Sequence, residues 1–87
     1  MNGSTLKPTP TLKEIELLLA SMIEQQEQKV FAFARRLNPR ITPDDMKNPH
    51  DFPELSDHDF NYEDGMLAGL HSALASVRRL DRERAHE

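Results

Sequence analysis

The stretch LNPRITPDDMKNPHDFPELSDHDFNYED, residues 37–64, decides how this chain folds. It holds four of the six prolines and eight of the fifteen acidic residues of the 87-residue chain. Two basic residues against eight acidic ones give it a net charge of −6, whereas the whole chain carries −4. Because a residue before proline is pushed out of the helical region, Asn38-Pro39 must end any helix that precedes it. The stretch therefore separates two segments and holds the excess negative charge.

The segment before this stretch has the pattern of one long amphipathic helix. Thr11-Leu12-Lys13-Glu14 fits a capping box, in which the first and fourth side chains each bond the other's backbone amide. Apolar residues then recur at helical spacing as far as Leu37. We predict a helix over residues 12–37, about 39 Å long at ~1.5 Å per residue. Gln26 lies on the apolar stripe, so we expect its amide to face a second helix.

The segment after the stretch predicts the second helix, over residues 62–84. Asn61 is a suitable N-cap and is followed by acidic residues, which favour a helix N-terminus. Gly65 and Gly69 each cost about 1 kcal/mol relative to alanine inside a helix, which suggests that another backbone passes close by. The apolar stripe expected on this helix consists of Tyr62, Met66, Leu70, Ala73, Val77 and Leu80, and Leu67 and Leu74 broaden it.

The connection, residues 38–61, has features of an ordered segment. Residues 42–45, Thr-Pro-Asp-Asp, have the pattern of a short helical start, with a cap, a proline and then acids. Apolar residues recur along it at intervals, which a disordered segment would not need. Residues 1–10, in contrast, are small, polar and proline-bearing, and we expect a flexible lead-in.

These elements predict an all-α fold, a long antiparallel helical hairpin with an ordered Pro/Asp-rich connection. Each apolar stripe is wider than the seam of two helices requires, so a lone hairpin would expose apolar surface. We expect a homodimer that forms a four-helix bundle. A monomer whose connection covers the helices as a third layer, or a complex with another protein, would also cover the stripes. The predicted interface residues are Leu12, Ile15, Leu19, Met22, Val30, Phe33, Leu37, Met66, Leu70, Ala73, Val77 and Leu80.

Composition limits the classes of function. The absence of cysteine excludes disulfides, thiolate metal sites and thiol nucleophiles. No apolar run approaches the ~20 residues needed to span a bilayer, and the N-terminus lacks a signal-peptide core, so we expect a cytoplasmic protein without a membrane partner. The acidic balance argues against binding of nucleic acid. The basic cluster over residues 78–84 is interleaved with acids and is typical of a solvated helix end.

Histidines and carboxylates gather in the connection. His50 and Asp51, followed by Asp57, His58 and Asp59, supply donors that suit zinc or another divalent transition metal. No recognised ligand spacing is present, so we expect no bound metal or other cofactor, with these residues solvated or capping short turns.

A second acidic pattern resembles that of the all-α nucleotide pyrophosphohydrolases. Residues 24–27, Glu-Gln-Gln-Glu, have the form E-x-x-E, and residues 54–57, Glu-Leu-Ser-Asp, have the form E-x-x-D. The resemblance implies that Glu24, Glu27, Glu54 and Asp57 hold magnesium on the phosphates of a nucleotide. This metal-dependent phosphohydrolase is the enzymatic alternative. The function we expect from the residues themselves is a small non-enzymatic protein–protein interaction or regulatory module that acts as a homodimer and meets a further protein partner.

Overall fold

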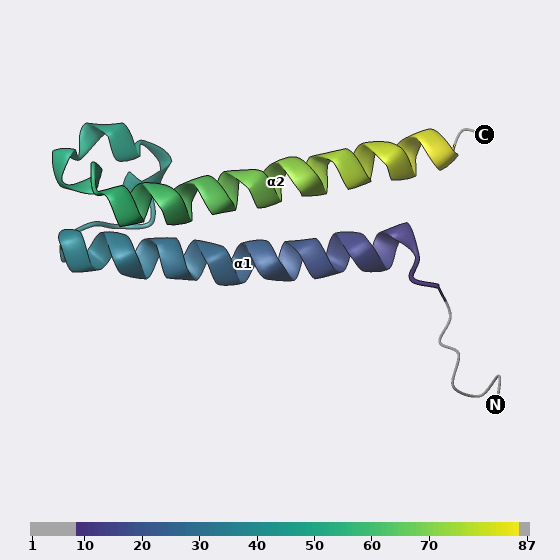
Figure 1. The fold of residues 1–87 in the computed structure, drawn as a ribbon, viewed down its shortest axis with the longest axis horizontal. Helices are drawn as coiled ribbons and strands as arrows, with labels where there is room; N and C mark the ends of the chain where they lie inside the picture. The colour runs from purple at the N-terminus through teal and green to yellow at the C-terminus, as the bar shows by residue number, and fades with distance from the viewer. Residues whose placement is uncertain (1–8, 86–87) are drawn as a thin grey trace, which may run out of the picture.

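The computed structural model describes residues 9–85 and forms an antiparallel helical hairpin (Figure 1). Helix α1 spans Leu12–Leu37 and helix α2 spans His58–Ala85. Between them lie three short 3-10 turns, η2 (Asp45–Lys47), η3 (Pro49–Asp51) and η4 (Pro53–Leu55). The described residues contain no strand, so the predicted all-α class and its two long packed helices are confirmed. Most of the predicted flexible lead-in, residues 1–8, lies outside the described residues.

Helix α1 has the two ends that its sequence predicts. The Glu14 amide donates to Thr11 Oγ1 at 3.1 Å, and the Thr11 amide donates to Glu14 Oε1 at 3.1 Å, which completes the capping box. At the other end the Asn38 amide still donates to the Ala34 carbonyl, but Asn38 itself is extended. Pro39 forbids the helical conformation at Asn38, so the chain leaves the helix there.

Helix α2 begins four residues earlier than the sequence pattern indicated. Asp57, not Asn61, is the cap: the Phe60 amide donates to Asp57 Oδ1 at 2.9 Å. Asn61 lies inside the helix, and its amide donates to the Asp57 carbonyl. Both residues are good N-caps. The earlier one is used because a helical first turn buries the Phe60 side chain, which is only 1% exposed.

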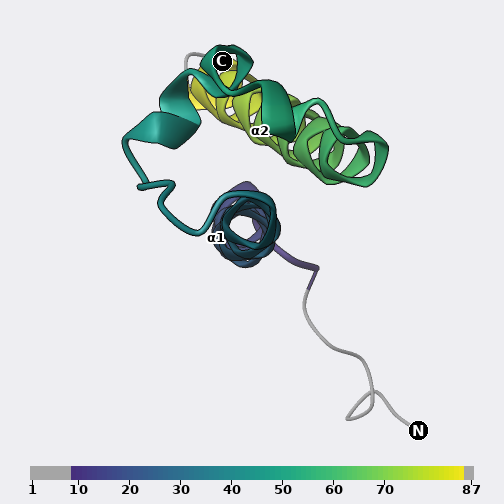
Figure 2. The ribbon, with the colours of Figure 1, turned by 90° about the vertical axis from the view of Figure 1, so that its left-hand side faces the viewer.

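The connection is folded by its own hydrogen bonds. The Thr42 amide donates to Asp45 Oδ2 at 2.9 Å, and the Asp45 amide donates to Thr42 Oγ1 at 3.2 Å. The predicted helical start is therefore present. Asn38 Nδ2 donates to Glu54 Oε1 at 2.7 Å and ties η4 to the end of α1. Figure 2, which looks along α1, shows the connection leaving α1 and swinging to one side before it joins α2.

The buried core lies at the connection end of the hairpin. The main buried cluster consists of Val30, Ala34, Ile41, Leu55 and Phe60. Two of these come from the connection, so the connection completes the core of the helices. Residues 12–22 and 75–85, in contrast, contain no buried residue. Figure 1 shows that the two helices separate toward the chain termini.

Helix α2 packs with only part of its predicted stripe: Leu70 and Val77 are half-buried, whereas Met66 and Leu80 are exposed. Its buried residues are Phe60 and Leu74, with Leu67 half-buried between them. Tyr62, at 65% exposed, and Ala73 lie in solvent. The seam residues recur every seven positions, and a heptad keeps one side of a helix turned toward its neighbour.

Candidate interaction face

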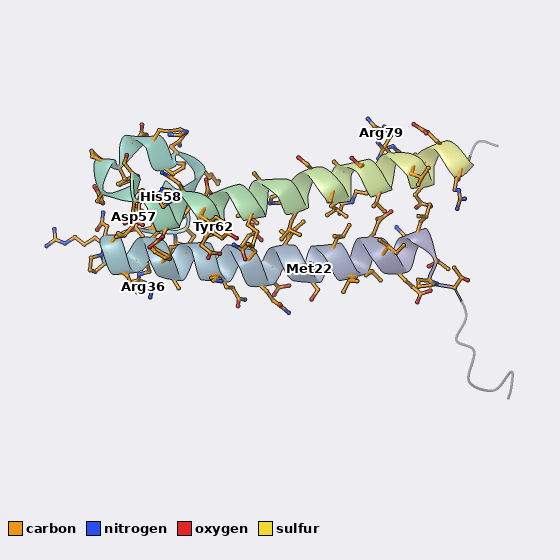
Figure 3. All side chains as sticks on the ribbon, viewed as in Figure 1. Met22, Arg36, Asp57, His58, Tyr62 and Arg79 are labelled. Atoms are coloured by element: carbon orange, nitrogen blue, oxygen red, sulfur yellow. The ribbon has the colours of Figure 1, made fainter. Side chains whose placement is uncertain are left out.

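An open groove of about 390 Å³ runs between the two helices on one side of the hairpin. Two methionines are exposed in it, Met22 of α1 at 41% and Met66 of α2 at 43%. Figure 3 places Met22 near the middle of α1. The groove is lined by Met22, Gln25, Gln26, Lys29, Met66 and Leu70.

Further apolar side chains extend this groove along both helices. At ~100° per residue, positions four or seven apart lie on the same side of a helix. By this spacing Leu18, 61% exposed, shares the side of Met22, and Leu80, 45% exposed, shares the side of Ala73 and Met66. Leu17, although 64% exposed, lies on a different side of α1. We name the resulting surface the open face; it consists of Leu18 and Met22 on α1 and Tyr62, Met66, Ala73 and Leu80 on α2.

The opposite side of the hairpin is covered by the connection near the connection end. Glu27 and Phe31 lie about 140° and 180° around α1 from Met22. They line a cleft of about 310 Å³ together with Pro43 and Met46 of the connection. The connection therefore packs over the connection end of this side and leaves the open face uncovered.

A polar network lies beneath the open face. Gln26, only 8% exposed, donates from Nε2 to both the carbonyl oxygen and Oε1 of Glu63, at 2.9 Å each. Lys29 Nζ lies 3.4 Å from the same Oε1. The hydrogen bond from Gln26 lowers the pKa of the Glu63 carboxyl, and Lys29 lowers it further, while desolvation opposes both. Gln26 thus faces the second helix as predicted, and its partner there is Glu63.

The structure divides the predicted interface residues into three groups. Val30 is buried within the chain, whereas Met22, Met66, Ala73 and Leu80 are exposed on the open face. The others are half-buried: Leu12, Ile15, Leu19, Phe33, Leu37, Leu70 and Val77.

The predicted acidic and histidine sites are not brought together. Within residues 9–85, no three histidine or carboxylate side chains gather closely enough to hold a metal ion. Asp57 caps α2, and Glu54 accepts a hydrogen bond from Asn38. Glu24 and Glu27 lie exposed on α1, and His50, Asp51, His58 and Asp59 are exposed too. Neither the four-carboxylate magnesium set nor the His/Asp set forms a site in this arrangement.

Arginines near the end of α2 pair with acids, whereas Gly65 and Gly69 have no close neighbour from another element. Arg78 Nε lies 3.7 Å from Glu16 Oε2 on α1, and Arg79 Nε lies 4.0 Å from Glu83 Oε1. A Cβ placed on Gly65 or Gly69 would meet no atom within 4 Å. The expectation that another backbone of this chain passes close to these glycines is therefore wrong.

No family model, curated protein or solved structure matches this chain, so its function must be inferred from its own geometry. Among the described residues, neither long helix has the apolar length that a membrane crossing requires. Sequence reasoning missed the division between buried seam and open face on α2. The spacing of Phe60, Leu67 and Leu74, seven residues apart, was the signal that could have found it.

Proposed function

We propose that this chain is a non-enzymatic protein–protein interaction module that forms a homodimeric four-helix bundle through its open face. The observation that carries the proposal is the asymmetry of the hairpin: the connection packs over one side near its own end, and the other side exposes apolar side chains along both helices. Apolar surface of this extent on a small chain is typical of an interaction site. A second hairpin placed on it would supply the missing layer.

The size of the open side supports a second copy as its occupant. Two adjacent helices ~39 Å long and ~10 Å apart present a face of about 800 Å². A stable interface of standard size buries about 800 Å² on each partner. The terminal parts of the helices would gain the most burial from this contact, because residues 12–22 and 75–85 contain no buried side chain.

The charges of the two helices support self-association. In α1, residues 12–24 carry one lysine and three glutamates, or −2, and residues 25–37 carry three bases and one acid, or +2. In α2, residues 58–71 carry three acids, or −3, and residues 72–85 carry four arginines and two acids, or +2. When a helix of a second copy packs antiparallel against either helix, each helix half therefore lies beside a half of opposite net charge.

A pair of charge insertions tests the proposal. Met66→Glu places a carboxylate in the open face and should shift the mass in solution from dimer to monomer, with dimerisation weakened at least ~10-fold because a buried unpaired charge is costly. Leu17→Glu is the matched control, since Leu17 is exposed but lies off this face. Circular dichroism reports whether each variant keeps its helices. Equal masses for both folded variants would contradict the assignment of the interface.

A further inference from the structure

We propose that the cleft between the connection and the two helices binds an arginine side chain of a basic segment of another protein. The cleft lies on the opposite side of the hairpin from the open face, so this site is independent of the proposed homodimer. The inference follows from an apolar cleft whose walls carry one carboxylate from each helix.

The cleft is built from all three parts of the hairpin, and Figure 2 shows the connection on one side of the two helices. Helix α1 supplies Val30 and Phe31, the connection supplies Pro43 and Met46, and α2 supplies Leu67. Phe31, Met46 and Leu67 are half-buried, so each still presents apolar surface that a ligand can cover. The volume of about 310 Å³ lies at the lower end of the range of ligand-binding cavities. The cleft therefore suits a single long side chain.

Two carboxylates lie on the walls of this cleft, Glu27 on α1 and Asp64 on α2. Asp64 is half-buried, whereas Glu27 is exposed. Within residues 9–85, no lysine, arginine or histidine forms an ion pair with either of them. A carboxylate that is partly withdrawn from water is usually paired, so a cation from outside the chain would supply the missing partner.

Two basic residues near the cleft have partners of their own. Lys47, which lines the cleft, has its Nζ 3.2 Å from Asp44 Oδ1. The Arg35 guanidinium lies 5.7 Å from the centre of the Phe31 ring and donates to the Pro39 carbonyl at 3.1 Å, just beyond the end of α1. The two carboxylates of the cleft therefore remain uncompensated.

The chemistry of the cleft fits arginine better than lysine. The aliphatic stem of an arginine can lie on Phe31 and Met46 while its guanidinium stays at the charged rim. A guanidinium has several N–H donors in one plane and can bond carboxylates from two helices at once, whereas an ammonium is a compact and strongly hydrated point charge.

The charge around the cleft favours a protein segment over a small free cation. Residues 37–64, which include the whole connection and Asp64, have a net charge of −6. This charge attracts further basic residues on either side of the bound arginine and raises the rate at which a basic segment associates. A segment of another protein can supply these residues, and a single free amine cannot.

NMR of the methionine methyl groups tests the site, because the methionines of the described residues report on different surfaces. Met46 lines the cleft, whereas Met22 and Met66 line the groove of the open face. The probe is a short glycine peptide with a central arginine and a lysine at each end. We expect the Met46 signal to shift in a saturable way and the Met22 and Met66 signals to stay unchanged.

Charge-removing variants test the two carboxylates. Glu27→Gln and Asp64→Asn change the shape of the side chain little, and each should weaken peptide binding about 3–10-fold. Glu24→Gln is the matched control, since Glu24 is an exposed glutamate of α1 that does not line the cleft, and it should change binding by less than ~2-fold. A peptide with a central lysine should bind more weakly than the arginine peptide. Circular dichroism reports whether each variant keeps its helices.

Several results would overturn the site. These are the absence of a saturable Met46 shift, or shifts of Met22 and Met66 in its place. Equal losses from Glu24→Gln and Glu27→Gln, or equal binding of the arginine and lysine peptides, would reduce the effect to general attraction by acidic charge and would also overturn it. The mass of the same sample reports on dimerisation separately: a monomer that binds the peptide would contradict the homodimer and leave this site standing.

Discussion

The side-chain amide of Gln26 on α1 donates at 2.9 Å to both the carbonyl oxygen and the carboxylate of Glu63 on α2. This contact joins two helix positions that are 37 residues apart, and it lies in an otherwise apolar seam. Buried polar groups of this kind cost free energy unless they are paired, so the pair opposes any sliding of one helix past the other. Gln26 therefore fixes the register that sets which side chains reach the open face.

Gln26→Ala should lower the free energy of unfolding by about 1–2 kcal/mol, because it removes the hydrogen bonds from a buried side chain to the carbonyl oxygen and Oε1 of Glu63. Urea denaturation followed by circular dichroism measures the change. Gln28→Ala, the same substitution at an exposed position of α1, should change stability by less than ~0.5 kcal/mol. Equal effects of the two substitutions would contradict a structural role for the Gln26 bond.

The Glu63 carboxyl should make stability depend on pH. Hydrogen bonding from Gln26 and the charge of Lys29 lower its pKa in the folded state below the ordinary value of 4.5. The folded state therefore favours the carboxylate form, and this contribution is complete above pH 4.5 and is lost as the pH falls through the lower, folded-state pKa.

We expect Glu63→Gln to be less stable than wild type near neutral pH and the difference to shrink below about pH 4.5. Denaturation curves over a pH series measure it. In a Gln26→Ala background, the same substitution should show a weaker pH dependence, since the largest cause of the shift has gone. A difference that stays constant with pH would be inconsistent with this network.

The connection should contribute to stability as a core element does. Leu55, 3% exposed in η4, packs in the main buried cluster, so Leu55→Ala should cost about 2–4 kcal/mol. Leu17→Ala, at an exposed position, should be within ~0.5 kcal/mol of wild type. If both substitutions were equally mild, the connection would not be packed as described.

The start of α2 gives a further prediction. Asp57→Ala removes the acceptor for the Phe60 amide and should cost about 1 kcal/mol. Asp51→Ala removes an exposed carboxylate of the connection and is the control. Thermal unfolding of both variants at neutral pH compares them, and a larger loss for Asp51→Ala would contradict the assignment of Asp57 as the cap.

Local chemistry made much of this fold predictable. The capping box of Thr11 and Glu14 and the stop at Pro39 are decided by neighbouring residues, and both ends of α1 follow from them. The start of α2 was not predictable in this way, because Asp57 and Asn61 are both good caps and the burial of Phe60 selects between them. Such burial depends on residues distant in sequence, Val30 and Ala34 among them.

The candidate face was predictable only in part. Hydrophobic spacing placed Met22 and Met66 among contact residues, but it could not tell contacts within the chain from surface left open. That division depends on which side the connection covers, and the packing of Met46 and Pro43 beside Phe31 decides it. The acidic patterns resemble a magnesium-binding set in sequence, but within residues 9–85 no three of their carboxylates gather closely enough to hold a metal ion.

The mass of the wild-type protein in solution tests the central claim most directly. Sedimentation equilibrium at tens of micromolar should give about 20 kDa, twice the 10.0 kDa of one chain. A single species of 10.0 kDa at those concentrations would contradict a homodimer formed through the open face.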